Sequence, residues 1–367
     1  MKKPHPHIST ERLRKVRTVL PPVPKRFKKV KSEQRIQEAF ENIPRITNET
    51  VAEHREDVLR GARKYKYPLQ HSKHKIVITS TALLILAIVG FFVYTLLSLY
   101  KFQSTSSFTY RITQVLPFPA AKAGGRFVAY ENYLFELRRY EHYYQSQQRV
   151  NFAGKDGKRQ LQRYKPIALN QVVQDAYVKQ LADRNHIRVS SAEVNQELEA
   201  LQAQNQSSPQ ELANVANIFF GWSISDLKRE VTQELLAQKV AATLDTVSGA
   251  KASSILKQLQ GGADFTALVA QYSDAPDKAA GGAYADQSIS ESSTDVPPAV
   301  VRALEKLQVG QTSDVIQAGD TLEIVKLTGT ANGKMQASHI SIKLTDVASF
   351  VAQYEQAHHA HRFITVD

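Results

Sequence analysis

One histidine near the end of the chain stands in a pattern that can carry chemistry. The run "ASHISIKL", residues 337–344, alternates apolar and polar residues as a β-strand does, and His339 lies near its middle. The preceding "TANGK" contains Asn332-Gly333, a strong hairpin signal. We therefore expect this strand to pair with the apolar segment that ends at Leu327.

The hairpin also predicts a partner for this histidine. Pairing Leu327 with Met335 would place Glu323 directly opposite His339, and opposed side chains have Cβ atoms about 4.5–5.5 Å apart. A hydrogen bond between the carboxylate and the imidazole would favour the imidazolium. A half-buried strand histidine without a function is the alternative interpretation.

Other reactive groups are scarce in the sequence. The chain has no cysteine, which excludes thiol nucleophiles, disulfides and Cys-based metal sites. His358 and His361 of "HHAHRF" could share a helix face, but no third ligand accompanies them, so we expect a solvated polar run. The sequence shows no phosphate loop, Ser/His/Asp order or paired-carboxylate motif, and we expect neither a cofactor nor a metal.

A single segment predicts where the chain is located. Between Lys75 and Lys101 lies an uncharged apolar run, residues 76–100, which as a helix would measure about 37 Å against roughly 30 Å of bilayer hydrocarbon. A cleaved signal peptide would have an apolar region of only about 7–15 residues near the terminus. We therefore predict one transmembrane helix.

The distribution of charge predicts the orientation of that helix. Residues 1–75 carry 20 Lys and Arg against 8 Asp and Glu, whereas the rest of the chain is balanced. Basic flanks stay on the cytoplasmic side, so residues 1–75 should be a cytoplasmic tail and residues 101–367 should lie outside. The balanced outer part gives no reason to expect nucleic-acid binding, although the tail "RLRKVRTVLPPVPKRFKKVK" could touch anionic lipid or RNA.

After a polar stretch at 101–114, predicted to be a linker, the chain shows helical spacing from Pro166 almost to Asp245. The order of "PFPAAKAGG", "ALNQVVQDAYVKQLADRNHIRVSSAEVNQEL" and "SISDLKREVTQELLAQKV" resembles the helical N-terminal module of SurA-type chaperones and PrsA-type foldases. The resemblance implies that residues 115–246 form a chaperone module for unfolded or nascent exported polypeptides.

The next stretch resembles the parvulin, or PpiC-type, family of peptidyl-prolyl isomerases. The matching features are a helix that ends in a Gly pair, "DF" opening the next helix, "YSD", a second Gly pair, and "VGQ" before two strands. The resemblance implies a parvulin-like domain over residues 247–367. The expected fold is membrane-anchored α+β: a helical chaperone module, then a small antiparallel four-stranded sheet with surrounding helices.

The resemblance also implies site residues. His339 matches the histidine of the first parvulin strand, Asp274 matches the aspartate of "YSD", and Glu323 occupies the place of the second histidine. The positions that would contact a substrate proline are Val296, Val300, Tyr272 and Gly282. The two valines are smaller than the Met and Phe usual in the family, whereas Gly282 is retained.

The parvulin first strand is missing from its usual place before the first helix. We interpret residues 337–344 as that strand, returned to the sheet by circular permutation, with Ile340, Ile342 and Leu344 buried and His339 and Ser341 on the opposite face. The truncated start of a second repeat is the alternative.

Two functions fit these features. One is a membrane-tethered foldase outside the cytoplasm that isomerises X-Pro bonds and binds unfolded exported chains. The other is a holdase or assembly scaffold in which the parvulin-like domain no longer turns over, as the glutamate at position 323 suggests.

Overall fold

The computed structural model describes residues 38, 40–41, 46–66, 68–285 and 287–366. Most of the predicted basic tail, residues 1–37, lies outside that range. The chain divides into two units, Met1–Ala87 and Ile88–Asp367. The first unit contains α2 (Asn48–Lys66) and the start of α3 (Pro68–Leu96).

Within the described residues, one helical stretch, His74–Lys101, is long and apolar enough to cross a membrane. It comprises most of α3 and the π-helix η1 (Leu97–Lys101). Its most apolar part is exposed to the surroundings throughout. The length and the composition of this stretch fit a membrane span, and membrane anchoring is proposed on that basis below.

The stretch predicted to be a polar linker, 101–114, has its own packed structure. Ser106 caps α4 (Ser107–Val115) by accepting a hydrogen bond from the backbone N–H of Thr109. Thr109 and Thr113 of α4 are buried, and α4 packs on α5 (Tyr130–Gln148). The serines and threonines of this stretch therefore serve as a helix cap and as packing residues.

Helices form most of the N-terminal module, as the periodicity predicts. After α5 come α6 (Lys155–Arg184), α7 (Ser191–Gln204), α8 (Pro209–Phe220) and α9 (Ile224–Leu244). The last three helices each begin with a capping box, in which a serine and an acidic residue three positions later satisfy each other's backbone N–H. One large core joins α5, α6 and α9.

The module also contains a small sheet that the sequence did not predict. Strand β1 (Pro119–Ala123) pairs with β2 (Arg126–Ala129) on one side and with β6 (Ala360–Arg362) on the other. Helix α13 (Val347–Ala357) packs on α6 and α9. The predicted boundary of 247–367 for the second domain is therefore wrong at its C-terminal end, because the last residues complete the core of the helical module.

The second domain lies between α9 and α13 in the chain. It consists of α10 (Thr246–Gln260), α11 (Phe265–Tyr272), η2 (Pro276–Ala280), α12 (Pro298–Leu304), β3 (Ile316–Ala318), β4 (Thr321–Ala331) and β5 (Lys334–Lys343). The antiparallel sheet has the order β3-β4-β5. The sheet has three named strands instead of the four predicted. Residues 283–289, which lie beside β5, pair with it only through isolated bridges, Ala283 with Ser338 and Ile289 with Met335.

The two faces of this sheet pack on different elements. Ile340, Ile342 and Leu344 are buried with residues of α10 and α11, as the alternation predicts. His339 pairs with Val325, whose side chain belongs to the core on the opposite face, against α12. The predicted division of β5 into two faces is therefore confirmed.

The predicted register of the hairpin is wrong by two residues. Leu327 pairs with Ala337, and Glu323 pairs with Ser341 instead of His339. Asn332 and Gly333 both have positive φ, which makes a tight two-residue turn between Ala331 and Lys334. A bulge after Leu327 then shifts the rest of the ladder.

Candidate functional site

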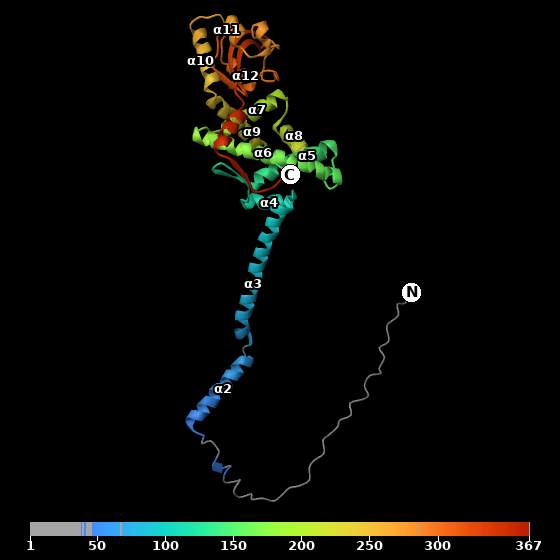
Figure 1. Ribbon diagram of the computed structural model, residues 1–367, viewed down its shortest axis with the longest axis vertical. Helices are drawn as coiled ribbons and strands as arrows, with labels where there is room; N and C mark the ends of the chain where they lie inside the picture. Colours follow the sequence, from blue (N-terminus) through green and yellow to red (C-terminus); the bar gives the residue numbers. More distant parts are fainter. Residues whose placement is uncertain (1–37, 39, 42–45, 67, 286, 367) are drawn as a thin grey trace, which may run out of the picture. The chain divides into compact units, whose positions relative to one another are not determined.

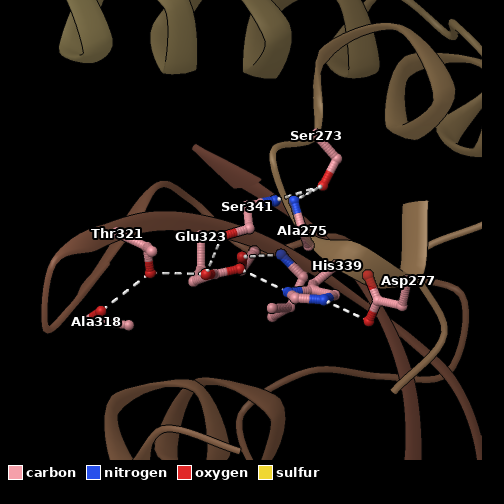
Figure 2. A network of polar contacts seen from close by, with 10 residues as sticks. Ser273, Ala275, Asp277, Ala318, Thr321, Glu323, His339 and Ser341 are labelled. Carbon is pink, nitrogen blue, oxygen red and sulfur yellow. Dashed lines mark hydrogen bonds and ion pairs between the residues drawn. The ribbon is translucent and has the colours of Figure 1, made fainter. Parts of the chain in front are cut away.

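His339 is bound between two carboxylates (Figure 2). Its Nδ1 lies 2.7 Å from Oε2 of Glu323, and its Nε2 lies 2.9 Å from Oδ2 of Asp277. Glu323 lies two residues before Val325, the residue opposite His339, so the contact is diagonal on one face of the sheet. The predicted hydrogen bond therefore forms in spite of the different register.

The other oxygen of Glu323 is also fully engaged. Its Oε1 accepts hydrogen bonds from Oγ of Ser341, at 2.6 Å, and from Oγ1 of Thr321, at 2.7 Å. Thr321 and Glu323 are two residues apart on β4 and so share a face of the sheet, and Ser341 lies opposite Glu323 on β5. The sheet itself therefore fixes this carboxylate, whose side chain is only 4% exposed.

Asp277 is the site residue that the sequence did not reveal. It lies in the short helix η2, which begins at Pro276, and it stands 62 positions before His339 in the chain. Its Oδ2 accepts from the imidazole, whereas its Oδ1 is buried without a hydrogen-bond partner among the described residues. The only sequence signal for it is an aspartate after a proline, three residues beyond "YSD".

Opposing effects determine the protonation of His339. Burial by itself would lower the pKa of the imidazole, but the hydrogen bond and charge of Glu323, followed by those of Asp277, raise it above its usual 6.5. An imidazolium can donate to both carboxylates, so both ring nitrogens are occupied. The ring of Tyr284 stacks on the imidazole with 4.2 Å between centroids.

Asp274, a predicted catalytic residue, lies outside this cluster. Its Oδ2 accepts from the backbone N–H of Lys343 and lies 3.4 Å from Nζ of Lys251. Its own N–H donates to the carbonyl of Ser341. Asp274 therefore fastens the end of β5, and its place beside the histidine is taken by Asp277.

The residues predicted to contact substrate also have structural roles here. Val296 and Val300 are completely buried in the core against α12, so neither side chain reaches the surface. Tyr272 packs at the edge of the core on the other face of the sheet. Gly282 accepts from the N–H of His339, and an added Cβ would lie 2.2 Å from the carbonyl oxygen of His339.

This geometry limits the chemistry of the site. The imidazole has no free lone pair while it donates to both carboxylates, so it cannot act as a base or nucleophile in this state. Among the described residues, no group of three or more His, Asp or Glu side chains has an arrangement that could hold a metal ion. The cluster is suited to fixing charge and shape, which is the kind of help that rotation about an amide bond needs, because that rotation breaks no covalent bond.

Comparisons with known proteins agree with the order of the two domains. The family described as "SurA-like N-terminal domain" matches residues 69–241. The family described as "PPIC-type PPIASE domain" matches residues 232–329. The chain combines a SurA-like N-terminal domain with a PPIC-type rotamase domain.

Curated relatives support the same assignment. The chain is 38% identical to the chaperone SurA of Methylobacillus flagellatus over 107 residues, which cover 27% of this chain and 24% of the relative. It is 32% identical to the chaperone SurA of Aromatoleum aromaticum over 136 residues, 34% of this chain and 30% of the relative. The matches thus span 24–30% of the length of these relatives.

A solved structure is also similar in part. The structure of the peptidylprolyl isomerase PrsA from Bacillus cereus is 19% identical over 55% of this chain and 79% of that chain, with a TM-score of 0.18. At this TM-score the likeness supports no conclusion about the fold. The assignment of the two domains therefore rests on the family matches and the SurA relatives.

Proposed function

We propose that this protein is a membrane-tethered foldase that works outside the cytoplasm. The SurA-like module would bind unfolded exported polypeptides, and the rotamase domain would isomerise their X-Pro bonds. The observation that carries the proposal is the presence of both domains in one chain. Uncatalysed isomerisation takes about 10–100 s, long enough for an exposed chain to aggregate.

Tethering is supported by the long apolar helix and by the charge around it. The stretch His74–Lys101 follows a strongly basic segment and precedes a balanced one. By the positive-inside rule, the two domains would lie outside the cytoplasm. Protease added to right-side-out vesicles should then digest residues 101–367 and spare the N-terminal tail, and protection of the domains would contradict this orientation.

For the isomerase site we propose His339 and Glu323 together with Asp277. Asp277 is the most exposed member, with 26% of its side chain accessible against 10% for His339. A substrate proline would therefore approach from the side of η2. Val296 and Val300 would have to become accessible before either could grip a proline ring.

We also propose that β5 is the first strand of the parvulin fold, carried at the far end of the domain. The family match ends at residue 329, before β5 begins at Lys334. Yet β5 pairs with β4 along its length and carries the site histidine. A vestigial second repeat would not be expected to supply both.

A holdase or scaffold without turnover is the second candidate, and one observation favours it. Both ring nitrogens of His339 are hydrogen-bonded to carboxylates, and the two valines expected in the pocket are fully buried. A site of this kind needs a conformational opening before it can bind a peptide. The two candidates differ in whether that opening occurs at a useful rate.

One experiment separates the two candidates. The full chain in detergent micelles is assayed for acceleration of the cis-to-trans step of a proline peptide and, separately, for suppression of aggregation of an unfolded polypeptide. A foldase should do both, and His339→Ala should abolish the first activity and leave the second. Suppression without acceleration would establish the holdase and refute the isomerase.

A further inference from the structure

The C-terminal end of the long apolar helix is part of the core of the helical module. Leu99 is completely buried, and its carbonyl accepts a 2.6 Å hydrogen bond from the hydroxyl of Tyr130. Oγ of Ser98 lies 3.2 Å from Oγ1 of Thr109 in α4, and the hydroxyl of Tyr100 donates to the carbonyl of Pro119 in β1. The last residues of the helical stretch, 98–100, are therefore packed directly against α4, α5 and β1.

The length of helix left outside this core matches a bilayer. Every residue from Ile76 to Tyr94 is exposed, and Thr95 is the first buried one. As a helix, this exposed stretch is about 28 Å long, close to the roughly 30 Å of bilayer hydrocarbon. If the stretch spans a membrane, no helix remains to hold the module away from the lipid surface.

Apolar side chains are exposed on α4 and just before it. Val115 of α4 is 80% exposed, and Phe102, which follows η1, is 69% exposed. The ring of Phe108, also exposed, lies 6.4 Å from the ring of Tyr94. Tyr94 ends the uninterrupted run of exposed residues, so the Phe108 ring would lie at the depth where a membrane changes from hydrocarbon to headgroups.

The sheet presents a second exposed apolar group. Lys122, Phe127 and His361 are in register across its three strands, and their neighbours Ala121 and Val128 point into the core. The ring of Phe127 stacks on that of Phe363 at 6.3 Å, and Nζ of Lys122 lies 5.5 Å from its centre. This face therefore combines aromatic rings with a cation.

The charge of the same region is of one sign. Between residues 101 and 130 the chain has no aspartate or glutamate, but it has Lys101, Arg111, Lys122 and Arg126. Of these four, Arg126 forms an ion pair with Asp183. Figure 1 shows α4, the β2-β1-β6 sheet and the C-terminal segment close together in the helical module. Exposed aromatic rings beside Lys101, Arg111 and Lys122 are the composition that anionic membrane surfaces attract.

We propose that this end of the module is a membrane-contact surface. It consists of the exposed side of α4 and the outer face of the β2-β1-β6 sheet, and it lies against anionic lipid headgroups. The inference rests on the proposed tethering. It adds that contact with the bilayer fixes the orientation of the helical module, which in turn restricts where the attached rotamase domain can lie relative to the membrane.

The absence of cysteine from the sequence makes a direct test straightforward. Single cysteines replace Phe108 and Phe127 in the full chain and carry an environment-sensitive fluorophore. Ile88→Cys, within the span, reports on tethering, and Val309→Cys, exposed in the rotamase domain, serves as the matched control. The labelled proteins are reconstituted in phosphatidylcholine vesicles with and without phosphatidylglycerol, with nitroxide quenchers at shallow or deep positions.

We expect the probes at 108 and 127 to shift to the blue in vesicles with phosphatidylglycerol and to be quenched by the shallow nitroxide. The deep nitroxide should quench the probe at 88, and neither should affect the probe at 309. Water-like emission at 108 and 127, with quenching at 88, would overturn the contact surface and leave tethering intact. No quenching at 88 would refute tethering, and the inference with it.

Charge reversal provides a second arm. Arg111→Glu combined with Lys122→Glu should lower the docked fraction, read from the probe at 108, by roughly tenfold or more, because each basic residue near an anionic surface contributes about fivefold. Lys257→Glu, on the exposed side of α10, should have no effect. A blue shift at 127 that grows with protein concentration in detergent would instead show that a second copy covers the face, and would overturn the proposal.

Discussion

The carboxylate of Glu323 gives the sharpest test of the site. Glu323→Gln keeps the volume of the side chain and leaves an oxygen that can accept from Ser341 and Thr321. It removes the negative charge beside the Nδ1 of His339, in a place where both side chains are almost fully buried. A hydrogen bond to a charged group contributes about 1.5–3 kcal/mol, and this is the expected loss.

Hydrogen exchange measures that loss in the full chain. Amides of β4 and β5, which exchange through local opening of the sheet, should exchange about 10- to 150-fold faster in Glu323→Gln, since about 1.4 kcal/mol corresponds to a factor of ten. The matched control is Asp274→Asn. Its side chain is 45% exposed, so its ion pair with Lys251 is weak and the change should be less than about 1 kcal/mol.

The same substitution should change the pH dependence of stability. The pKa of His339 is raised in the folded chain, so its stabilising effect is complete below the usual histidine pKa of about 6.5 and is lost as the pH rises through the raised value. The opening free energy of the sheet should therefore fall above about pH 6.5 in the natural chain, and less so in Glu323→Gln. Equal pH profiles for the two proteins, or equal effects of Glu323→Gln and Asp274→Asn, would refute the charged network.

Three further outcomes are expected. Gly282→Ala adds a Cβ at 2.2 Å from the carbonyl oxygen of His339, at a φ of +70°, so it should destabilise the rotamase domain by more than about 2 kcal/mol, measured by hydrogen exchange of β5. Truncation after Ala357 removes β6 and a buried isoleucine beyond it, about 1.5–3 kcal/mol of apolar burial, and should lower the melting temperature of the helical module followed by the fluorescence of Trp222. Burial raises the pKa of Asp175 from 3.8 to about 6. Its ionisation therefore lowers the stability of the folded chain as the pH rises through this range. Asp175→Asn should therefore raise that melting temperature near pH 8 and leave it almost unchanged near pH 4.

Periodicity and turn chemistry predicted much of the second domain. The alternation in β5 correctly gave its two faces, because the period of a strand is fixed by the backbone. The contact of His339 with Glu323 was also predicted, although from a register that is wrong. A shift by an even number of residues keeps each side chain on its face, so a diagonal contact replaced the direct one.

What the sequence did not reveal depends on distant pairings. Asp277 reaches His339 only because η2 folds against the strand, and no local pattern indicates that approach. The three residues of β6 are too few to show an alternation, so the sheet at the base of the helical module could not be predicted. The polar residues after the span suggested a linker, yet Ser106 is a helix cap, a role that composition alone does not distinguish.

The pairing of β6 with β1 has a consequence for biosynthesis. The N–H of Phe363 donates to the carbonyl of Ala120, so these partners are about 240 residues apart. At roughly 5–20 residues per second, a ribosome needs on the order of 12–50 s to make the second partner after the first. During that time one edge of β1 lacks its partner strand β6. The whole rotamase domain leaves the ribosome in the same interval and can fold. The module that would receive unfolded chains therefore becomes complete only after the rotamase domain has been made.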